Sequence, residues 1–382
     1  MSHVDKKAEP LLSRPTPFPS SPSCVESIIP KTSISMTDDF VLDDTMEDAS
    51  RNPFTSSNTT PTLSEVSPLE SRCFWKSDLP HLLDPDYFIS MGYFTDSVQE
   101  PGRCHHVLSS LGTHKVSYLD SKYRITESLG RGSFSDVFKV RRNIDDAYFA
   151  LKCTREAFTG LSDRLRKLYE VAHMWLLTTS PHCVQIVESW EQTGRLYIVM
   201  ELCENGSLQD IIHFMSKNDV KFTEYQIWQI LRQISLGLEN IHRRGIVHLD
   251  IKPANIFIDG QGSLKIGDFG LSVRVGSQHD LDMEGDKYYM APETLEGLYH
   301  KPADVFSLGL LALELATDVE LPSQGTSWQN LRHGDYSELD FNDVSDALGH
   351  LIREMTDPDP FQRPAIEEIL RRIDTYSERF LA

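Results

Sequence analysis

The sequence contains no apolar run long enough to cross a membrane, since a spanning helix needs about 20 consecutive apolar residues. The most apolar stretch, residues 308–316, is shorter than that and is interrupted by Glu314. The chain also opens without the basic and apolar pattern of a secretory signal. These absences predict a protein without a membrane span.

Paired cysteines are missing as well. The six cysteines are scattered and none forms a CxxC pair, which is typical of a reduced, intracellular protein. Cys104, His105 and His106 lie together, but no second ligand pair follows at zinc spacing. The sequence therefore does not predict a structural metal site.

Long basic clusters are also absent. The chain has 37 Lys and Arg residues against 57 Asp and Glu residues, a formal net charge of -20, and no basic run longer than a pair. Such a chain repels polyanions, which excludes nucleic acid as an expected partner. The composition, 40% hydrophobic and 25% charged, is typical of a globular protein with one large domain or two ordinary ones.

The first part of the chain differs from the rest. Residues 1–70 are dense in Ser, Thr, Pro, Asp and Glu and show no helical or strand period, which predicts a disordered acidic tail. Its Ser/Thr-Pro steps are either sites for proline-directed modification or a consequence of composition. Residues 71–122 carry several aromatic side chains and predict an N-terminal extension, which either packs on the folded domain or docks a partner.

From residue 123 the pattern changes to alternating or apolar runs followed by helical periods. Strands are predicted at residues 125–129, 137–140, 148–153, 184–187 and 196–200. Helices are predicted at residues 162–177, 224–242, 303–316, 345–355 and 365–376. A strand-rich part followed by a helix-rich part indicates an α+β fold with two lobes. The predicted domain spans residues 123–377, with a short tail at 378–382.

A glycine-rich turn is the first candidate for binding chemistry. Residues 129–137 read LGRGSFSDV, and Gly130 and Gly132 allow backbone N–H groups to approach phosphate oxygens without a Cβ clash. Ser135 stands where a third glycine is expected, at a modest cost to binding. Alone the motif is weak, because many hairpins contain Gly-x-Gly. The residues predicted to bind a nucleotide here are Leu129, Gly130, Arg131, Gly132, Ser133, Phe134, Ser135 and Val137.

A lysine follows on a predicted strand. Ala150 and Lys152 lie at the distance downstream that a phosphate-binding lysine requires. The ammonium of Lys152 needs a carboxylate to fix it, and we expect Glu170 on the helix 162–177 to supply it. Glu156 is too close in sequence to lie on that helix. Two unrelated surface charges are the alternative interpretation.

The strongest signal is the run HLDIKPAN at residues 248–255. Phosphoryl transfer requires the phosphates, a metal ion and the acceptor hydroxyl to be held in line, with the developing charge neutralised. In this spacing Asp250 accepts the proton of the acceptor hydroxyl, Lys252 neutralises the γ-phosphate and Asn255 binds magnesium. Asp268, in the triplet DFG, is expected to bridge magnesium to the phosphates. ATP and Mg²⁺ are therefore the expected cofactors.

These motifs, closed by the triplet APE at residues 291–293, occur in one order, and residues 123–377 resemble a eukaryotic protein kinase domain over its whole length. The resemblance implies that Asp304 braces the catalytic loop. It also implies a buried ion pair between Glu293 and Arg363. The residues that the resemblance places around the adenine are Ala150, Met200 as the gatekeeper, and Glu201 and Cys203 as the hinge.

Within the kinases, four stretches are similar to the Wee/Myt branch: HLDIKPANIF at 248–257, EGDKYYMAPE at 284–293, ADVFSLG at 303–309 and ELP at 320–322. The resemblance implies transfer to tyrosine, with or without a neighbouring threonine, in the glycine-rich loop of a cyclin-dependent kinase bound to its cyclin. That modification implies inhibition and a delay of mitosis. Because no membrane segment follows the last predicted helix, we expect an enzyme of the nucleus, the cytoplasm or both. We also expect a monomer.

Two residues depart from the common kinase pattern. Most kinases carry an arginine where Leu249 stands, and it pairs with a phosphate on the activation loop. Leucine cannot do so, and activity is therefore expected without that phosphorylation. Asp286 stands where Ser/Thr kinases usually carry threonine, and its carboxylate can pair with Lys252. Lys252 alone favours Ser/Thr specificity, whereas the family resemblance favours tyrosine.

Other functions stay open at this point. One is a general Ser/Thr kinase, near the kinases of translation initiation factors, which have a similar catalytic loop. Another is a pseudokinase scaffold, against which the intact Lys152, Asp250, Asn255 and Asp268 argue. A third is a kinase whose activity is gated by residues 1–122.

Overall fold

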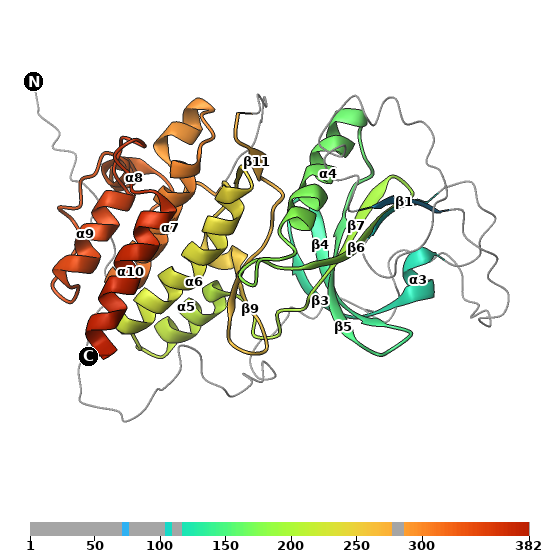
Figure 1. The fold of residues 1–382 in the computed structure, drawn as a ribbon, viewed down its shortest axis with the longest axis horizontal. Coiled ribbons are helices and arrows are strands. Elements are labelled where there is room, and N and C mark those ends of the chain that lie inside the picture. The colour runs from blue at the N-terminus through green and yellow to red at the C-terminus, as the bar shows by residue number, and fades with distance from the viewer. Residues whose placement is uncertain (1–70, 76–103, 109–116, 277–285, 382) are drawn as a thin grey trace, which may run out of the picture. The chain divides into compact units, whose positions relative to one another are not determined.

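The structure, a computed structural model, describes residues 71–75, 104–108, 117–276 and 286–381, with side chains described for 117–276 and 286–376. The described residues fall into two compact units. The sheet unit runs up to Thr178 and includes Val184–Cys203, and the helical unit holds Thr179–Cys183 and the residues from Glu204 onward. Figure 1 labels most of the helices and strands of both units. The predicted tail 1–70 and most of the extension 71–122 lie outside the described residues.

The sheet unit is built on a mixed sheet with the strand order β1-β2-β6-β7-β5-β4-β3. Its strands are β1 (Ser71–Trp75), β2 (Cys104–Leu108), β3 (Tyr123–Arg131), β4 (Ser135–Arg142), β5 (Tyr148–Thr154), β6 (Ile186–Gln192) and β7 (Arg195–Met200). All neighbouring strands of this sheet are antiparallel except the pair β2 and β6, which is parallel. One helix of this unit, α4 (Leu161–Leu176), contacts β6.

An aromatic core covers one face of the sheet. Trp190 on β6 stacks between Tyr123 and Tyr197, with ring centroids 6.2 Å and 4.9 Å away. Leu151 and Cys153 on β5 belong to the same core. Because side chains alternate along a strand, the β5 residues on either side of Leu151 face the opposite side of the sheet.

A short helix, α3 (Tyr118–Lys122), completes this core. Tyr118 and Leu119 are 6% and 1% exposed, and the ring of Tyr118 lies 5.0 Å from that of Trp190. The side chain of Asn143 donates to the carbonyls of Asp120 and Ser121 at 3.2 Å and 3.1 Å. Residues 118–122, in the predicted extension, therefore pack on the sheet unit.

Buried Glu188 on β6 joins α3 to β3. It accepts hydrogen bonds from the hydroxyls of Tyr118 at 3.3 Å and Tyr123 at 2.6 Å. The ammonium of Lys122 lies 3.1 Å from the same carboxylate. Burial, followed by the charge of Glu188, raises the pKa of Tyr123 far above its ordinary value, so this phenol stays a hydrogen-bond donor.

The helical unit carries most of the helices and only short strands. Its helices are α5 (Leu208–Lys217), α6 (Glu224–Arg243), α7 (Lys301–Thr317), α8 (Gly325–Arg332), α9 (Asp346–Met355) and α10 (Ile366–Leu381). Its strands and 3₁₀ turns are β8 (Ile246–Val247), η3 (Pro253–Asn255), β9 (Ile256–Ile258), β10 (Leu264–Ile266), β11 (Val273–Arg274) and η4 (Pro292–Glu296).

The helix starts follow from local sequence. Capping boxes open α5, between Ser207 and Asp210, and α6, between Thr223 and Gln226. Both α6 and α10 bury one face and pack together, and α7 packs on α9. Gly309 permits that second contact, because a Cβ at this position would lie 2.6 Å from a methyl carbon of Thr356.

The predicted fold class, α+β with a sheet-rich and a helix-rich part, is confirmed. One strand was predicted too early and too short: the run 184–187 shares only Ile186 and Val187 with β6, which spans Ile186–Gln192. Its glutamates made the true strand look polar, yet Glu188 and Glu191 are buried with partners. The helices α5 and α8 were not predicted. Within the described part of the chain, no helix is both long and apolar enough to cross a membrane.

Candidate active site

The glycine-rich motif forms the hairpin between β3 and β4. The amide of Gly132 donates to the carbonyl of Ser135 at 2.8 Å, and a Cβ at Gly132 would lie only 3.2 Å from that oxygen. A Cβ at Gly130, in contrast, would meet nothing within 4 Å. The open space beside Gly130 is what a phosphate-binding turn requires. Phe134, at the tip of the hairpin, is 76% exposed.

Strand register places several predicted nucleotide-binding residues on one face of the sheet. Gly130 lies opposite Val137, and Val137 lies opposite Lys152. Ala150, two residues before Lys152, lies opposite Met200 on β7. Since directly opposite residues share a face and alternate residues of one strand share a face, all five are on the same side. The aromatic core occupies the other side.

The remaining residues of the hairpin and the hinge are less enclosed. Leu129 is 44% exposed, and the guanidinium of Arg131 lies 3.8 Å from Asp136. Ser133 sits in the turn before β4. Glu201 is tied to Gln185, whose carbonyl accepts from the Glu201 amide at 2.9 Å. The thiol of Cys203, at the end of the sheet unit, is half-buried and forms no disulfide.

The expected ion pair between Lys152 and Glu170 is present. The ammonium of Lys152 on β5 lies 2.7 Å from the Glu170 carboxylate on α4, and both side chains are largely buried. A second pair fixes the same helix, because Arg164 makes two hydrogen bonds of 2.7 Å and 2.8 Å to Glu191 on β6. Glu156 lies outside α4. The helix is thus held to the sheet at two points by charge-assisted hydrogen bonds.

In the helical unit, Asp304 on α7 holds the loop that precedes η3. It is fully buried and accepts hydrogen bonds from the amides of His248 at 2.9 Å and Leu249 at 2.8 Å. The ring of His242 lies 2.8 Å from the same carboxylate. Leu249 has a φ of +66°, in the left-handed region that a bulky side chain rarely adopts. The bonds to Asp304 stabilise that backbone against its strain.

Asp250 lies at the centre of this loop. Its Oδ2 accepts from the side-chain amide of Asn255 at 2.7 Å and lies 3.0 Å from the ammonium of Lys252. Its Oδ1 is buried and has no hydrogen-bond partner among the described residues. A buried carboxylate oxygen without a partner is costly, and this one is therefore ready to accept a proton from a bound hydroxyl.

Lys252 bridges two acids. Its ammonium lies 3.0 Å from Asp250 and 3.3 Å from Asp286. Burial opposes the charge of Lys252, but the two carboxylates outweigh it and raise the pKa of the lysine. Lys252 is therefore positively charged at neutral pH, and it connects the loop of Asp250 to the segment that contains Asp286.

The DFG triplet is tied to the same loop. The amide of Gly267 donates to the carbonyl of Asn255 at 2.9 Å, and the His248 ring lies 3.1 Å from the carbonyl of Gly267. Phe269 is 1% exposed and packs edge-on against His248. Asp268 lies between Gly267 and Phe269 in the chain, and its φ is +59°. These bonds place Asp268 in the same unit as Asp250 and Asn255, next to the loop that carries them.

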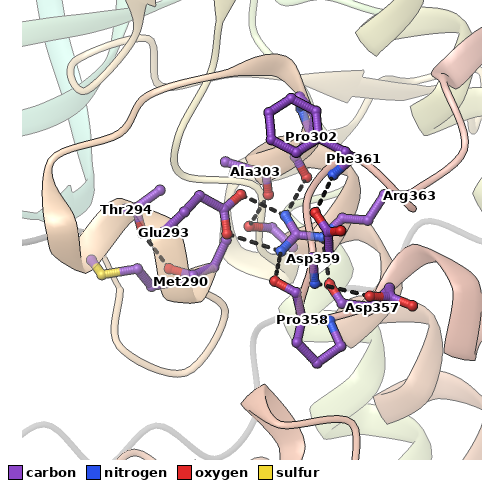
Figure 2. A network of polar contacts seen from close by, with 12 residues as sticks. Met290, Glu293, Thr294, Pro302, Ala303, Asp357, Pro358, Asp359, Phe361 and Arg363 are labelled. Carbon is purple, nitrogen blue, oxygen red and sulfur yellow. Dashed lines mark hydrogen bonds and ion pairs between the residues drawn. The ribbon is translucent and has the colours of Figure 1, made fainter.

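The Glu293–Arg363 pair, which the family resemblance implied, is present (Figure 2). The guanidinium of Arg363 makes two hydrogen bonds of 2.5 Å and 2.9 Å to the Glu293 carboxylate. It also donates to the carbonyls of Pro302 at 2.9 Å and Asp357 at 2.7 Å, and it stacks over the ring of Phe306 at 4.7 Å. The pair joins η4, α7 and the turn before α10.

Comparison with known proteins settles the family. The family model of the protein kinase domain matches residues 123–373. The chain belongs to the protein kinase family.

The kinase domain is similar to named regulators of mitosis. It is 38% identical to the mitosis inhibitor protein kinase wee1 of Schizosaccharomyces pombe, over 69% of this chain and 32% of that protein. It is also 38% identical to the membrane-associated tyrosine- and threonine-specific cdc2-inhibitory kinase of Drosophila melanogaster, over 69% of this chain and 49% of that protein. The chain thus spans about a third of one relative and about half of the other.

A probable protein kinase of Dictyostelium discoideum is 38% identical over 66% of this chain and 72% of its own length. The resemblance to the Wee/Myt kinases is confirmed by these relatives, and the enzyme class, an ATP-dependent protein kinase, is confirmed at the level of the family.

Kinases of this family use ATP and usually Mg²⁺, and the residues present fit both. The side-chain nitrogen of Asn255 is engaged by Asp250, which leaves the amide oxygen as a ligand. With a carboxylate from Asp268, this gives the oxygen ligands that Mg²⁺ prefers, the rest being phosphates and water. The described residues contain no group of three or more acidic, His or Cys side chains that could hold a metal ion.

Sequence reasoning missed the residues that hold the 286–290 segment of the kinase. Trp328 and Arg332 on α8 donate to its carbonyls, and the hydroxyl of Tyr289 donates to Glu314 on α7 at 2.6 Å. Trp328 and Arg332 lie four residues apart, or one helical turn, and this spacing is the only sequence feature that relates them. A buried arginine without an acidic neighbour cannot be recognised from spacing alone.

Proposed function

We propose that this kinase transfers the γ-phosphate of ATP to a protein hydroxyl, with Asp250 as the base that receives the hydroxyl proton. The observation that supports this most directly is the buried, unpartnered Oδ1 of Asp250. Its other oxygen is fixed by Asn255 and Lys252, so the carboxylate is oriented before an acceptor arrives. A positioned base of this kind contributes about 10²–10⁴-fold to the rate.

The other residues divide the remaining work. Lys252 neutralises charge on the transferred group, while Asn255 and Asp268 would hold Mg²⁺, which when bound offsets negative charge on the phosphates. Lys152, fixed by Glu170, binds the phosphates from the sheet unit. The face formed by Gly130, Val137, Ala150 and Met200, with the turn residues and the Glu201–Cys203 backbone, binds the rest of the nucleotide.

We further propose that the acceptor is a tyrosine, with or without the adjacent threonine, in the glycine-rich loop of a cyclin-dependent kinase bound to cyclin. The names of the relatives support this substrate, since one is a tyrosine- and threonine-specific cdc2-inhibitory kinase and another a mitosis inhibitor. A phosphate on that loop adds about -1.5 to -2 charges beside the ATP phosphates of the target. The modified enzyme would be inhibited and mitosis delayed. A nuclear or cytoplasmic location and a monomeric state stay predictions.

The test is incubation of the purified chain with ATP, Mg²⁺ and a catalytically inactive cyclin-dependent kinase–cyclin complex, followed by phosphopeptide mass spectrometry. We expect phosphotyrosine in the glycine-rich loop of the target. Asp250→Asn serves as the matched control, because it keeps the shape of the side chain and should lose at least about 100-fold in transfer while still binding nucleotide.

The side-chain chemistry of Lys252 also favours a second candidate, a general Ser/Thr kinase. Phosphoserine or phosphothreonine alone, at sites outside the glycine-rich loop, would support that candidate and overturn the proposed substrate. No transfer to any acceptor, with intact nucleotide binding, would instead indicate a pseudokinase scaffold.

A further inference from the structure

The 286–290 segment is held by its backbone carbonyls. The Lys287 carbonyl accepts from the Trp328 indole at 2.7 Å and from Arg332 at 2.8 Å. Arg332 also donates to the carbonyls of Tyr288 and Met290, each at 3.1 Å. Residues 328 and 332 lie one turn apart on the same face of α8, and all these contacts come from that face. Two side chains of one short helix thereby bind three of the five backbone carbonyls of this segment.

The remaining carbonyls of the segment are also satisfied. The carbonyl of Tyr289 accepts from the hydroxyl of Ser307 on α7 at 2.9 Å. The carbonyl of Asp286 accepts from the amides of Tyr289 and Met290, each at 3.1 Å. Every carbonyl from 286 to 290 therefore has a donor, which is the condition for a well-ordered backbone.

Arg332 is unusual because its charge is buried without a counter-charge. The residue is 3% exposed, and no carboxylate in the part of the chain that the structure describes offsets the effect of burial on its charge. Its guanidinium stacks on the Trp328 ring at 3.9 Å. Burial lowers the pKa of Arg332 to about 9, so the group is still charged at neutral pH. Such a charge is costly to bury, and here carbonyl dipoles and an aromatic face compensate it.

The held segment is coupled directly to the catalytic loop. Asp286 accepts from the amide of Tyr288 at 3.1 Å through one oxygen. Its other oxygen lies 3.3 Å from the ammonium of Lys252, which lies 3.0 Å from Asp250. A shift of the segment would therefore move Asp286, and Lys252 would lose one of its two carboxylates.

Leu249 stands in this loop where most kinases carry an arginine that binds a phosphate. Leu249 borders a partly open hollow of about 20 Å³ with Leu271, Met290 and Ala291. A hollow of this size holds at most about one water molecule and is too small for a phosphate. The described side chains that hold the carbonyls of the segment come from α8 and α7.

We infer that Arg332 and Trp328 form a constitutive clamp that positions the acceptor side of the active site, in the role that a phosphorylated activation loop has in other kinases. They are positioning residues, since they act on Lys252 through Asp286 and do not touch the reacting atoms. The inference rests on the proposed phosphotransfer activity, because it concerns the acceptor side of that same site.

The test compares the full-length chain with Arg332→Met, which keeps an unbranched apolar side chain and removes the donors. Arg353→Met is the matched control, because Arg353 also stacks on a ring, that of Phe341 at 4.3 Å, and donates to a carbonyl one turn back but contacts no residue of 286–290. Amide hydrogen exchange of residues 286–294 is the first measurement. We expect exchange in Arg332→Met to rise roughly tenfold or more, and to stay unchanged in this segment in Arg353→Met.

Steady-state kinetics is the second measurement. Loss of the clamp should lower kcat/KM for the protein acceptor by roughly tenfold and leave the KM for ATP within about twofold. Arg332→Lys should lie between wild type and Arg332→Met, because it keeps the charge with fewer donors. Equal exchange and equal kcat/KM in Arg332→Met and Arg353→Met would overturn the inference.

A third variant guards against misfolding. Trp328→Phe keeps the ring under the guanidinium and removes the donor to Lys287, so it should raise exchange several-fold in a folded chain. If Arg332→Met does not fold, the result for Trp328→Phe decides, and unchanged exchange there overturns the clamp. Hydrogen exchange requires no acceptor, so failure of the wild-type chain to phosphorylate the cyclin-dependent kinase complex would refute the proposed substrate separately.

Discussion

Removal of helix α3 should destabilise the sheet unit strongly, although α3 lies before the part that the kinase family model matches. A chain that begins at residue 123 lacks Tyr118 and Leu119, which are 6% and 1% exposed against the aromatic core. Full burial of side chains of this size contributes about 1.5–3 kcal/mol each, or about 3–6 kcal/mol together. That sum is an upper value, because a real unfolded chain already buries some of this surface.

The polar contacts of α3 add less. Glu188 would lose the hydroxyl of Tyr118 and the ammonium of Lys122 but keep the hydrogen bond from Tyr123 at 2.6 Å. Lys122 is 43% exposed, so its ion pair contributes little. The remaining hydroxyl contributes about 1 kcal/mol.

Thermal unfolding of two shortened chains measures the effect. A chain that begins at residue 117 keeps α3 with its N-cap, and a chain that begins at 123 does not, while both lack β1 and β2. At about 2–4 °C per kcal/mol for a domain of this size, the second should melt roughly 10 °C lower. Tyr118→Phe in the longer chain separates the hydroxyl from the packing and should cost about 1 kcal/mol.

A melting temperature within about 2 °C for the two chains would refute this reasoning. It would mean that Trp190 and its neighbours are shielded equally well without α3.

Three further outcomes are expected. Arg363→Met should destabilise the helical unit by about 3–5 kcal/mol, since it leaves Glu293 buried without a partner, and an unchanged denaturation midpoint would contradict this. Phosphatase treatment of the purified chain should leave kinase activity within about twofold, because the side chain of Leu249 cannot pair with a phosphate. Complete loss of activity would show that a phosphate is required. Asp304→Asn should reduce kcat at least about tenfold and change the affinity for ATP little. The reason is that one backbone amide of the strained loop would then face an N–H group in place of an acceptor oxygen. Steady-state kinetics measures both quantities, and a wild-type kcat would exclude a positioning role for Asp304.

The sequence was most informative where chemistry fixes both residue type and spacing. The run HLDIKPAN and the later triplets predicted the loop around Asp250, and the structure places Asn255, Lys252 and the DFG triplet in contact with it. The strand of Lys152 and the helix of Glu170 were also predicted, within one or two residues of their observed bounds. The catalytic roles of these residues stay predictions until they are measured.

Burial of charge was the main source of error. β6 was placed too early because Glu188 and Glu191 are typical of exposed positions, and only their distant partners explain why they are buried. The same reason hid Arg332, whose partners are carbonyls that have no sequence signature. α5, in contrast, carried a readable signal in the Ser207–Asp210 capping box, which the sequence reasoning overlooked.

The contacts of Arg332 and Trp328 are to backbone oxygens, and backbone oxygens are the same in every amino acid. The side chains of Lys287 and Tyr288 are exposed and take no part in the hydrogen bonds from Trp328 and Arg332 that hold this segment. Libraries randomised at these two positions should retain an intact fold, which makes them the natural place to redirect the enzyme toward other protein targets.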